Sequence, residues 1–88
     1  MDRKTELSRI VAPDWTLHSL TLLTEPAGSN QYVAVLNRTE GLLPTSLIVR
    51  SQKFMRAQPD LGELVAWKDL LAKTARHLAK NAARVARS

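Results

Sequence analysis

The tail of the chain, from Asp60 to Ser88, carries the clearest pattern of hydrophobic and polar positions. Apolar residues recur there in steps of three and four, which places one side of a helix at Leu64, Trp67, Leu71, Ala75, Leu78, Ala82 and Val85. No proline or glycine interrupts the chain after Gly62, and strong helix formers dominate. Asp60 and Glu63 have the spacing of a capping pair. The pattern predicts one long amphipathic helix, with Leu70 exposed beside its apolar side.

The middle of the chain has strand-like patterns separated by turn signals. Residues 15–24 (WTLHSLTLLT) and 31–37 (QYVAVLN) flank a turn signal at 26–30, which predicts a β-hairpin. Residues 38–41 form the next predicted turn. Residues 45–53 hold the strongest β-forming run of the chain, the Leu-Ile-Val sequence, and predict a third strand.

Alternation is poor in the first of these strands. A regular strand would turn Leu17 and Leu23 to one face and Leu20 and Leu22 to the other. Two arrangements explain such a pattern: a strand covered on both faces, or a bulge that shifts the register.

Residues 1–12 predict a short helix that ends before Pro13, because proline disfavours helical geometry in the preceding residue. The expected fold is α+β, in the order α-β-β-β-α. A three-stranded antiparallel sheet packs one face on the long C-terminal helix. Residues 1–88 make a single small domain. At about 1.5 Å per residue the helix runs roughly 40 Å, so its end is expected to project from a domain about 30 Å across.

The order of elements is similar to that of the double-stranded RNA-binding domain. That family places a lysine cluster at the start of its second helix. Here Asp60 and Glu63 occupy the helix start, the basic residues come later, and the first helix is shorter. The resemblance concerns layout, and no function is carried across from it.

Charge changes the interpretation of the tail. The chain has 13 lysines and arginines against 8 acidic residues, and the formal excess of +5 lies entirely from Lys73 onward. At about 100° per residue, five cations fall within an arc of roughly 80° opposite the apolar side: Lys73, Arg76, Lys80, Arg84 and Arg87. Asp69 is expected to pair with Lys73 one turn later. We call these five cations the basic stripe.

The sequence offers little for catalysis. There is no cysteine, which excludes disulfides and thiolate chemistry, and His18 and His77 alone do not supply a zinc site. Gly28, Gly41 and Gly62 form no phosphate-binding loop, and nothing resembles a nucleophile elbow. We therefore expect a non-enzymatic protein with no metal, no cofactor and no small-molecule substrate.

The expected location depends on the absence of membrane-span and secretion signals, and the expected assembly depends on the length of the chain. No apolar run reaches the length of a membrane span, and the N-terminus lacks the apolar core of a secretory signal, so we expect a cytoplasmic protein. A chain of 88 residues buries only a modest core, which leaves room for a homodimer.

Nucleic acid is the ligand that the stripe favours, because aligned cations can follow a phosphate backbone. Arg50, Lys53 and Arg56 are candidate extensions of the same surface. A nucleoprotein or other acidic partner presents the same chemistry. The alternative function is that of a phage-type stoichiometric inhibitor or adaptor, for example of a host defence complex, which binds protein through the helix or a sheet edge; Leu70 favours it. A solvated helix end is the plain alternative, since cations also complement the helix dipole there.

Overall fold

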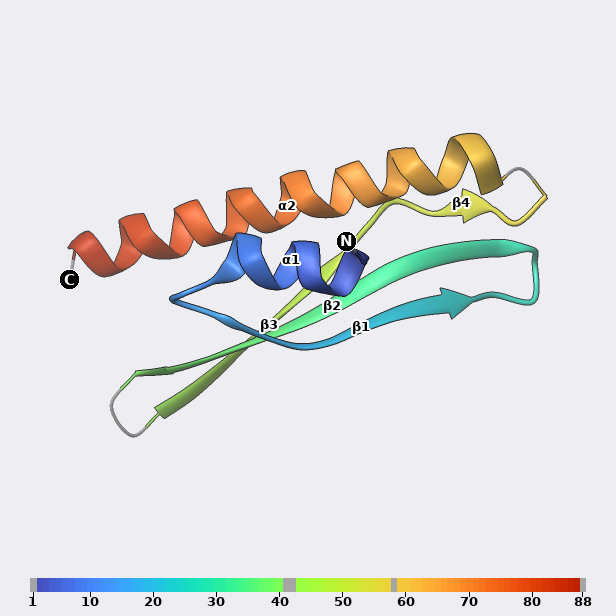
Figure 1. Ribbon diagram of the computed structural model, residues 1–88. Coiled ribbons are helices and arrows are strands. Elements are labelled where there is room, and N and C mark those ends of the chain that lie inside the picture. Colours follow the sequence, from blue (N-terminus) through green and yellow to red (C-terminus); the bar gives the residue numbers. More distant parts are fainter. Residues whose placement is uncertain (1, 41–42, 58, 88) are drawn as a thin grey trace.

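The computed structural model describes residues 2–40, 43–57 and 59–87, and it describes side chains at 2–38, 45–57 and 62–80. The elements follow one another as α1 (Arg3–Val11), β1 (Thr16–Thr24), β2 (Ser29–Glu40), β3 (Leu43–Arg50), β4 (Phe54–Met55) and α2 (Pro59–Arg87) (Figure 1). The predicted α+β fold is therefore confirmed, with β4 as a short addition between the third strand and the long helix.

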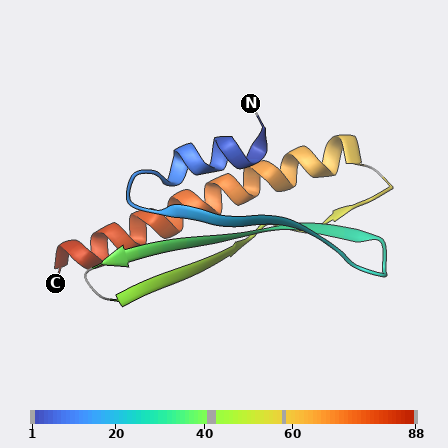
Figure 2. The ribbon, with the colours of Figure 1, turned by 60° about the horizontal axis from the view of Figure 1, so that its bottom comes forward.

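The sheet is antiparallel, in the order β1-β2-β3, and β4 continues the β3 side of it by pairing with the start of β2. The predicted turn at residues 38–41 is wrong in part, because Arg38 to Glu40 extend β2 and pair with β3 as far as Leu43. Both helices lie over one face of the sheet, with α1 next to β1 and α2 next to β3 and β4 (Figures 1 and 2).

A β-bulge resolves the poor alternation of β1. The register shifts between Leu17 and Ser19, so that Leu17 lies opposite Leu36 and Leu20 lies opposite Ala34. The extra residue, His18, puts both leucines on the helix-covered face. Of the two arrangements expected from the sequence, the bulge is the one that the structure contains.

The core lies between the sheet and the two helices. On β2, every second side chain from Tyr32 to Leu36 is buried, which is the pattern of a strand covered on one face. The buried apolar side chains come from both helices, from β2, β3 and β4, and from Trp15 just before β1; they are Leu7, Val11, Trp15, Tyr32, Ala34, Leu36, Val49, Phe54, Ala66, Trp67 and Leu70. Among the residues placed in the structure, no helix is long and apolar enough to cross a membrane.

The rotational setting of α2 differs from the prediction. Leu70 is fully buried rather than exposed, whereas Leu64 is 47% exposed and Ala75 is also exposed. The buried side runs through Ala66, Leu70 and Thr74, roughly 80° from the predicted apolar side. Burial of Thr74 is tolerated because its hydroxyl donates to the Leu70 carbonyl at 2.8 Å, so a polar residue occupies a core position without an unsatisfied hydrogen-bonding group.

An aromatic and ionic network joins α1, β2 and α2. The Tyr32 hydroxyl donates to Glu63 Oε1 at 2.7 Å, and Arg3 pairs with the same oxygen at 2.6 Å. Trp67 Nε1 donates to Glu6 at 2.9 Å, and its ring meets the Tyr32 ring edge-on at 5.5 Å. Burial, and then the bond to the Glu63 carboxylate, raises the pKa of Tyr32 to about 12. Glu63 therefore ties the helix to the sheet, a role that its predicted capping function did not include.

Candidate functional site

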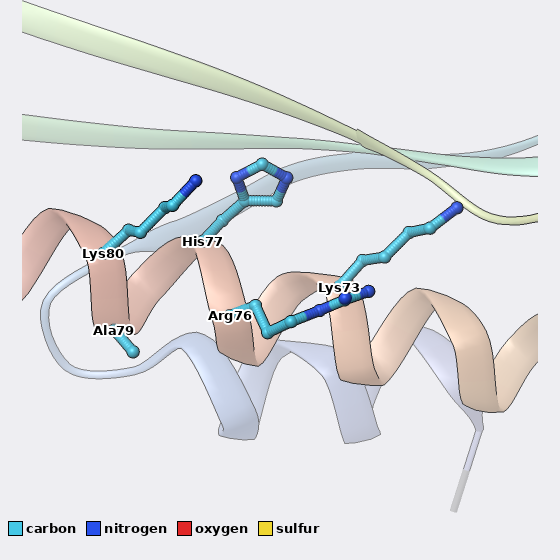
Figure 3. A pocket seen from close by; sticks show the side chains of 5 residues that line it. All are labelled: Lys73, Arg76, His77, Ala79 and Lys80. Atoms are coloured by element: carbon cyan, nitrogen blue, oxygen red, sulfur yellow. The ribbon is translucent and has the colours of Figure 1, made fainter.

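A groove of about 620 Å³ runs along the second half of α2, and its described lining consists of Lys73, Arg76, His77, Ala79 and Lys80. Lys73, His77 and Lys80 point from the helix toward the strands of the sheet, and Arg76 extends along the helix toward Lys73 (Figure 3). The described lining contains no carboxylate. The charged side chains of this lining are all basic.

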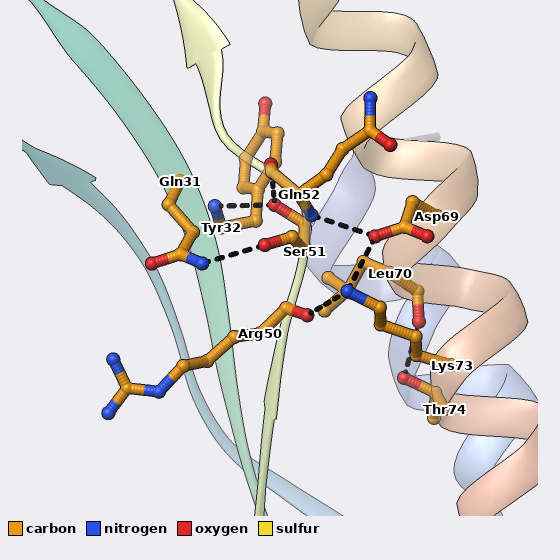
Figure 4. Close-up of polar contacts among 9 residues, drawn as sticks. All are labelled: Gln31, Tyr32, Arg50, Ser51, Gln52, Asp69, Leu70, Lys73 and Thr74. Atoms are coloured by element: carbon orange, nitrogen blue, oxygen red, sulfur yellow. Dashed lines mark hydrogen bonds and ion pairs between the residues drawn. The ribbon is translucent and has the colours of Figure 1, made fainter.

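Lys73 has partners within the chain. Its Nζ lies 2.9 Å from Asp69 and donates to the Arg50 carbonyl at 3.1 Å, which confirms the predicted pair of Asp69 and Lys73 and adds a contact to the end of β3 (Figure 4). Partial burial raises the pKa of Asp69, but hydrogen bonds from Lys73 and from the Gln52 N–H outweigh it, and the pKa lies below its ordinary value. Lys73 therefore has two roles: it lines the groove, and it holds the end of β3 against α2.

The end of β3 is held in place for this contact by Ser51. Its hydroxyl oxygen accepts from the Tyr32 N–H at 3.0 Å, and its carbonyl accepts from Gln31 Nε2 at 2.7 Å. The next residue, Gln52, donates its N–H to Asp69 at 2.7 Å. These bonds join β2, the end of β3 and α2 (Figure 4). They hold the end of β3 beside the part of α2 from which Lys73 extends.

Arg76 and Lys80 are exposed and lie one helical turn apart. The other two predicted stripe residues, Arg84 and Arg87, belong to α2, but their side chains lie outside the described residues. The structure thus places three of the predicted cations together, at Lys73, Arg76 and Lys80, and joins His77 to them.

The predicted extension of the stripe is not brought together with it. The guanidinium of Arg50 points away from α2 (Figure 4), while Lys53 and Arg56 both contact Glu25 at the turn between β1 and β2. Lys53 Nζ lies 2.8 Å from the Glu25 carboxylate, and Arg56 donates to the Glu25 carbonyl at 2.8 Å. Hydrogen bonds from Lys53 and Ser29 lower the pKa of Glu25. This second basic cluster lies near the start of α2, away from the groove.

The described cations of the stripe, Lys73, Arg76 and Lys80, do not lie opposite the buried side of α2, as the sequence predicted, but about a quarter of a turn from it. This setting turns the cations toward the edge of the sheet. Figure 1 shows α2 separating from the hairpin of β2 and β3 toward the C-terminal end of the helix. Lys73, Arg76 and Lys80 line the groove described above from this side of the helix.

Metal chemistry finds no support in the part of the chain that the structure describes, where no three His, Asp or Glu side chains come close enough to hold an ion. Comparisons with protein-family models, with curated protein sequences and with solved structures give no match to this chain.

Proposed function

We propose that the groove of α2 docks on a polyanionic surface, either nucleic acid or a nucleoprotein complex, and that the protein acts by binding rather than by catalysis. The observation that carries this proposal is the convergence of Lys73, Arg76 and Lys80 on one concave surface whose described lining holds no carboxylate. An anion in such a groove meets the exposed Arg76 and Lys80 together, with Lys73, which is already paired with Asp69, beside them.

The geometry favours contact with a backbone over the recognition of bases. Arg76 and Lys80 are exposed and contribute charge without a stacking platform, because the described aromatic residues of α2 and β2, Trp67 and Tyr32, are buried in the core. Cations that neutralise phosphates release counterions, so the expected affinity depends strongly on salt and weakly on sequence.

The test is fluorescence anisotropy of labelled duplex DNA, duplex RNA and single strands across a range of salt concentrations. A plot of log affinity against log salt for duplex DNA falls by about 0.9 per phosphate neutralised. In the variant Arg76→Glu/Lys80→Glu, we expect the slope to fall by about two units and the affinity to fall at least about tenfold.

A matched control keeps the overall charge change the same. Lys4→Glu/Lys68→Glu also reverses two exposed lysines, one on α1 and one on α2, outside the groove. This control is expected to retain most of the affinity and nearly the full slope. Equal weakening by both variants would mean that net charge alone drives binding. Retention of affinity by Arg76→Glu/Lys80→Glu would refute the proposal that the groove is the binding surface.

The alternative function is that of a stoichiometric protein inhibitor or adaptor, and the structure changes which exposed apolar residues favour it. Leu70 no longer favours it, since it is buried, but Leu64 and Val65 are 47% and 52% exposed on the first half of α2. Replacing both by serine tests this function, because loss of a stoichiometric partner from nuclease-treated host lysate would assign binding to that apolar pair rather than to the groove.

A further inference from the structure

The outer edge of β1 presents unpaired backbone groups. From Ser19 to Thr24, β1 pairs in one unbroken register with β2, and the bond from the Glu25 N–H to the Ser29 carbonyl, 2.8 Å, continues that register. Residues of an antiparallel strand alternate between bonding to the partner and pointing away from it. Leu20, Leu22 and Thr24 therefore turn their N–H and C=O groups away from β2, and the structure describes no strand on that side.

This edge lacks the usual protection against strand pairing. The segment from Ser19 to Thr24 contains no charged residue and no proline. The opposite edge of the sheet, β3, contains Pro44, and the ammonium of Lys73 occupies the Arg50 carbonyl at its end. The two edges thus differ: β3 is blocked at both ends, at Pro44 and at the Arg50 carbonyl, whereas β1 is free from Ser19 onward.

Exposed leucines accompany the free backbone groups. Leu22 lies opposite Tyr32 on the helix-covered face of the sheet, yet it is 44% exposed. Figure 1 shows the reason, since the second half of β1 runs past the N-terminal end of α1. Leu23, on the other face, is 41% exposed. Apolar area is therefore available on both faces at the place where the edge is free.

We propose that a second copy of this chain pairs antiparallel with β1, with Leu22 opposite Leu22 of the partner subunit at a twofold axis. In that register Leu20 lies opposite Thr24 of the partner subunit, and the three outward-pointing residues of each copy exchange about six backbone hydrogen bonds. Directly opposite residues share a face, so the helices of both copies lie on the same side of one continuous sheet.

Charge favours a second copy over an unrelated acidic partner at this edge. The segment from Ser19 to Thr24 is neutral, and the groove cations lie beside β3, on the other edge of the sheet. Two chains that each carry a formal charge of +5 can therefore meet here with their groove cations apart. An edge of six residues is a small interface, so we expect micromolar rather than nanomolar affinity.

The test is sedimentation equilibrium from micromolar to near-millimolar concentration, without nucleic acid. We expect the mass to rise from 9.8 kDa toward twice that value with concentration. Leu22→Lys places two cations opposite each other at the axis and is expected to stay monomeric, while circular dichroism reports whether it remains folded. Ile48→Lys, on the uncovered face of β3, is the matched control and is expected to associate like the parent.

The register has its own test, because the chain contains no cysteine. Facing residues of a hydrogen-bonded pair have Cα atoms about 5.5 Å apart, within the range of a disulfide, so Leu22→Cys is expected to form a covalent dimer under mild oxidation. In the same register the two copies of Thr24→Cys lie roughly 14 Å apart and are expected to stay reduced.

A parent chain that remains at 9.8 kDa at the highest concentration overturns the proposal. Association that survives Leu22→Lys but fails with Ile48→Lys also overturns it and assigns the interface to the uncovered sheet face. Crosslinking by Thr24→Cys in preference to Leu22→Cys would refute the register. None of these outcomes depends on the polyanion groove.

Discussion

The two halves of α2 differ in what their side chains do. In the first half, from Gly62 to Thr74, Ala66, Trp67, Leu70 and Thr74 are buried. In the described part of the second half, from Ala75 to Lys80, only Leu78 is partly buried, and the remaining side chains are exposed. One continuous helix therefore serves as a core element at one end and as a carrier of exposed cations at the other.

This division separates stability from binding along one helix. Substitutions in the first half should change the free energy of unfolding, because they remove buried contacts. Substitutions in the second half should change ligand affinity and leave stability nearly constant. A polyanion surface of this kind can be altered without disturbing the fold that supports it.

The largest expected effect is that of Trp67→Ala. The indole is buried against Tyr32 and its N–H bonds to Glu6, so its removal leaves a cavity and an unpaired carboxylate. We expect a loss of about 3–5 kcal/mol in the free energy of unfolding, measured by denaturant titration. A loss below about 1 kcal/mol would contradict the assignment of the core to this half of the helix.

Gly62→Ala is expected to destabilise next most strongly. In an exposed helix the change gains about 1 kcal/mol, but here the added Cβ would lie 2.9 Å from Phe54 Cβ, against backbone-proximal atoms that cannot turn aside. Overpacking costs about 1–3 kcal/mol, so the net result is a loss of about 1 kcal/mol. A rise in the thermal midpoint would show that β4 moves away from the added methyl group at little cost in free energy.

Tyr32 is the single tyrosine of the chain, so the ultraviolet absorbance of tyrosinate reports it alone. We expect it to titrate near pH 12 in the folded protein, against 10.0 for an ordinary tyrosine. Because the folded state holds this proton more tightly, stability is expected to fall as the pH rises above about 10. Tyr32→Phe should lose about 1 kcal/mol at neutral pH. An ordinary titration midpoint would contradict the burial of Tyr32 and its bond to Glu63.

Asp69→Asn tests the contact between the first half of α2 and the end of β3, where Asp69 holds Lys73 and Gln52. We expect a loss of about 1 kcal/mol at neutral pH. The folded pKa of Asp69 lies below 3.8, so its contribution is present above that pH and disappears as the pH falls through the folded pKa. The stabilities of parent and variant should therefore converge in acid, as denaturant midpoints would show.

The smallest expected effect on stability is that of Arg76→Glu/Lys80→Glu, within about 0.5 kcal/mol of the parent. Both side chains are exposed, and their separation of one turn makes them repel weakly in the parent. Thermal unfolding checks the result alongside the anisotropy measurement. A large destabilisation would mean that the second half of α2 also supports the core.

The sequence predicted the elements but not how the long helix is turned. The strands, the hairpin and the pair of Asp69 and Lys73 follow local patterns that propensity and spacing reveal. The setting of α2 could not be predicted from the apolar residues, because alanine is only weakly apolar and occurs on several sides of the helix, while Thr74 is polar and yet is buried beside Ala66. The bond of Lys73 to the Arg50 carbonyl is a tertiary contact without a local signal. The position of the groove depends on the rotational setting of α2 and on this bond, so the sequence did not reveal it.

The bond between Glu6 and Trp67 joins residues 61 positions apart, and it has a consequence for synthesis. A ribosome adds about 5–20 residues per second, so α1 waits roughly 3–12 s for the segment of α2 that completes its network. Contacts of such long range also slow folding after release. Until Trp67 emerges, the core side of β2 and β3 lacks the cover of α2, and a nascent chain is then most exposed to chaperones and to aggregation.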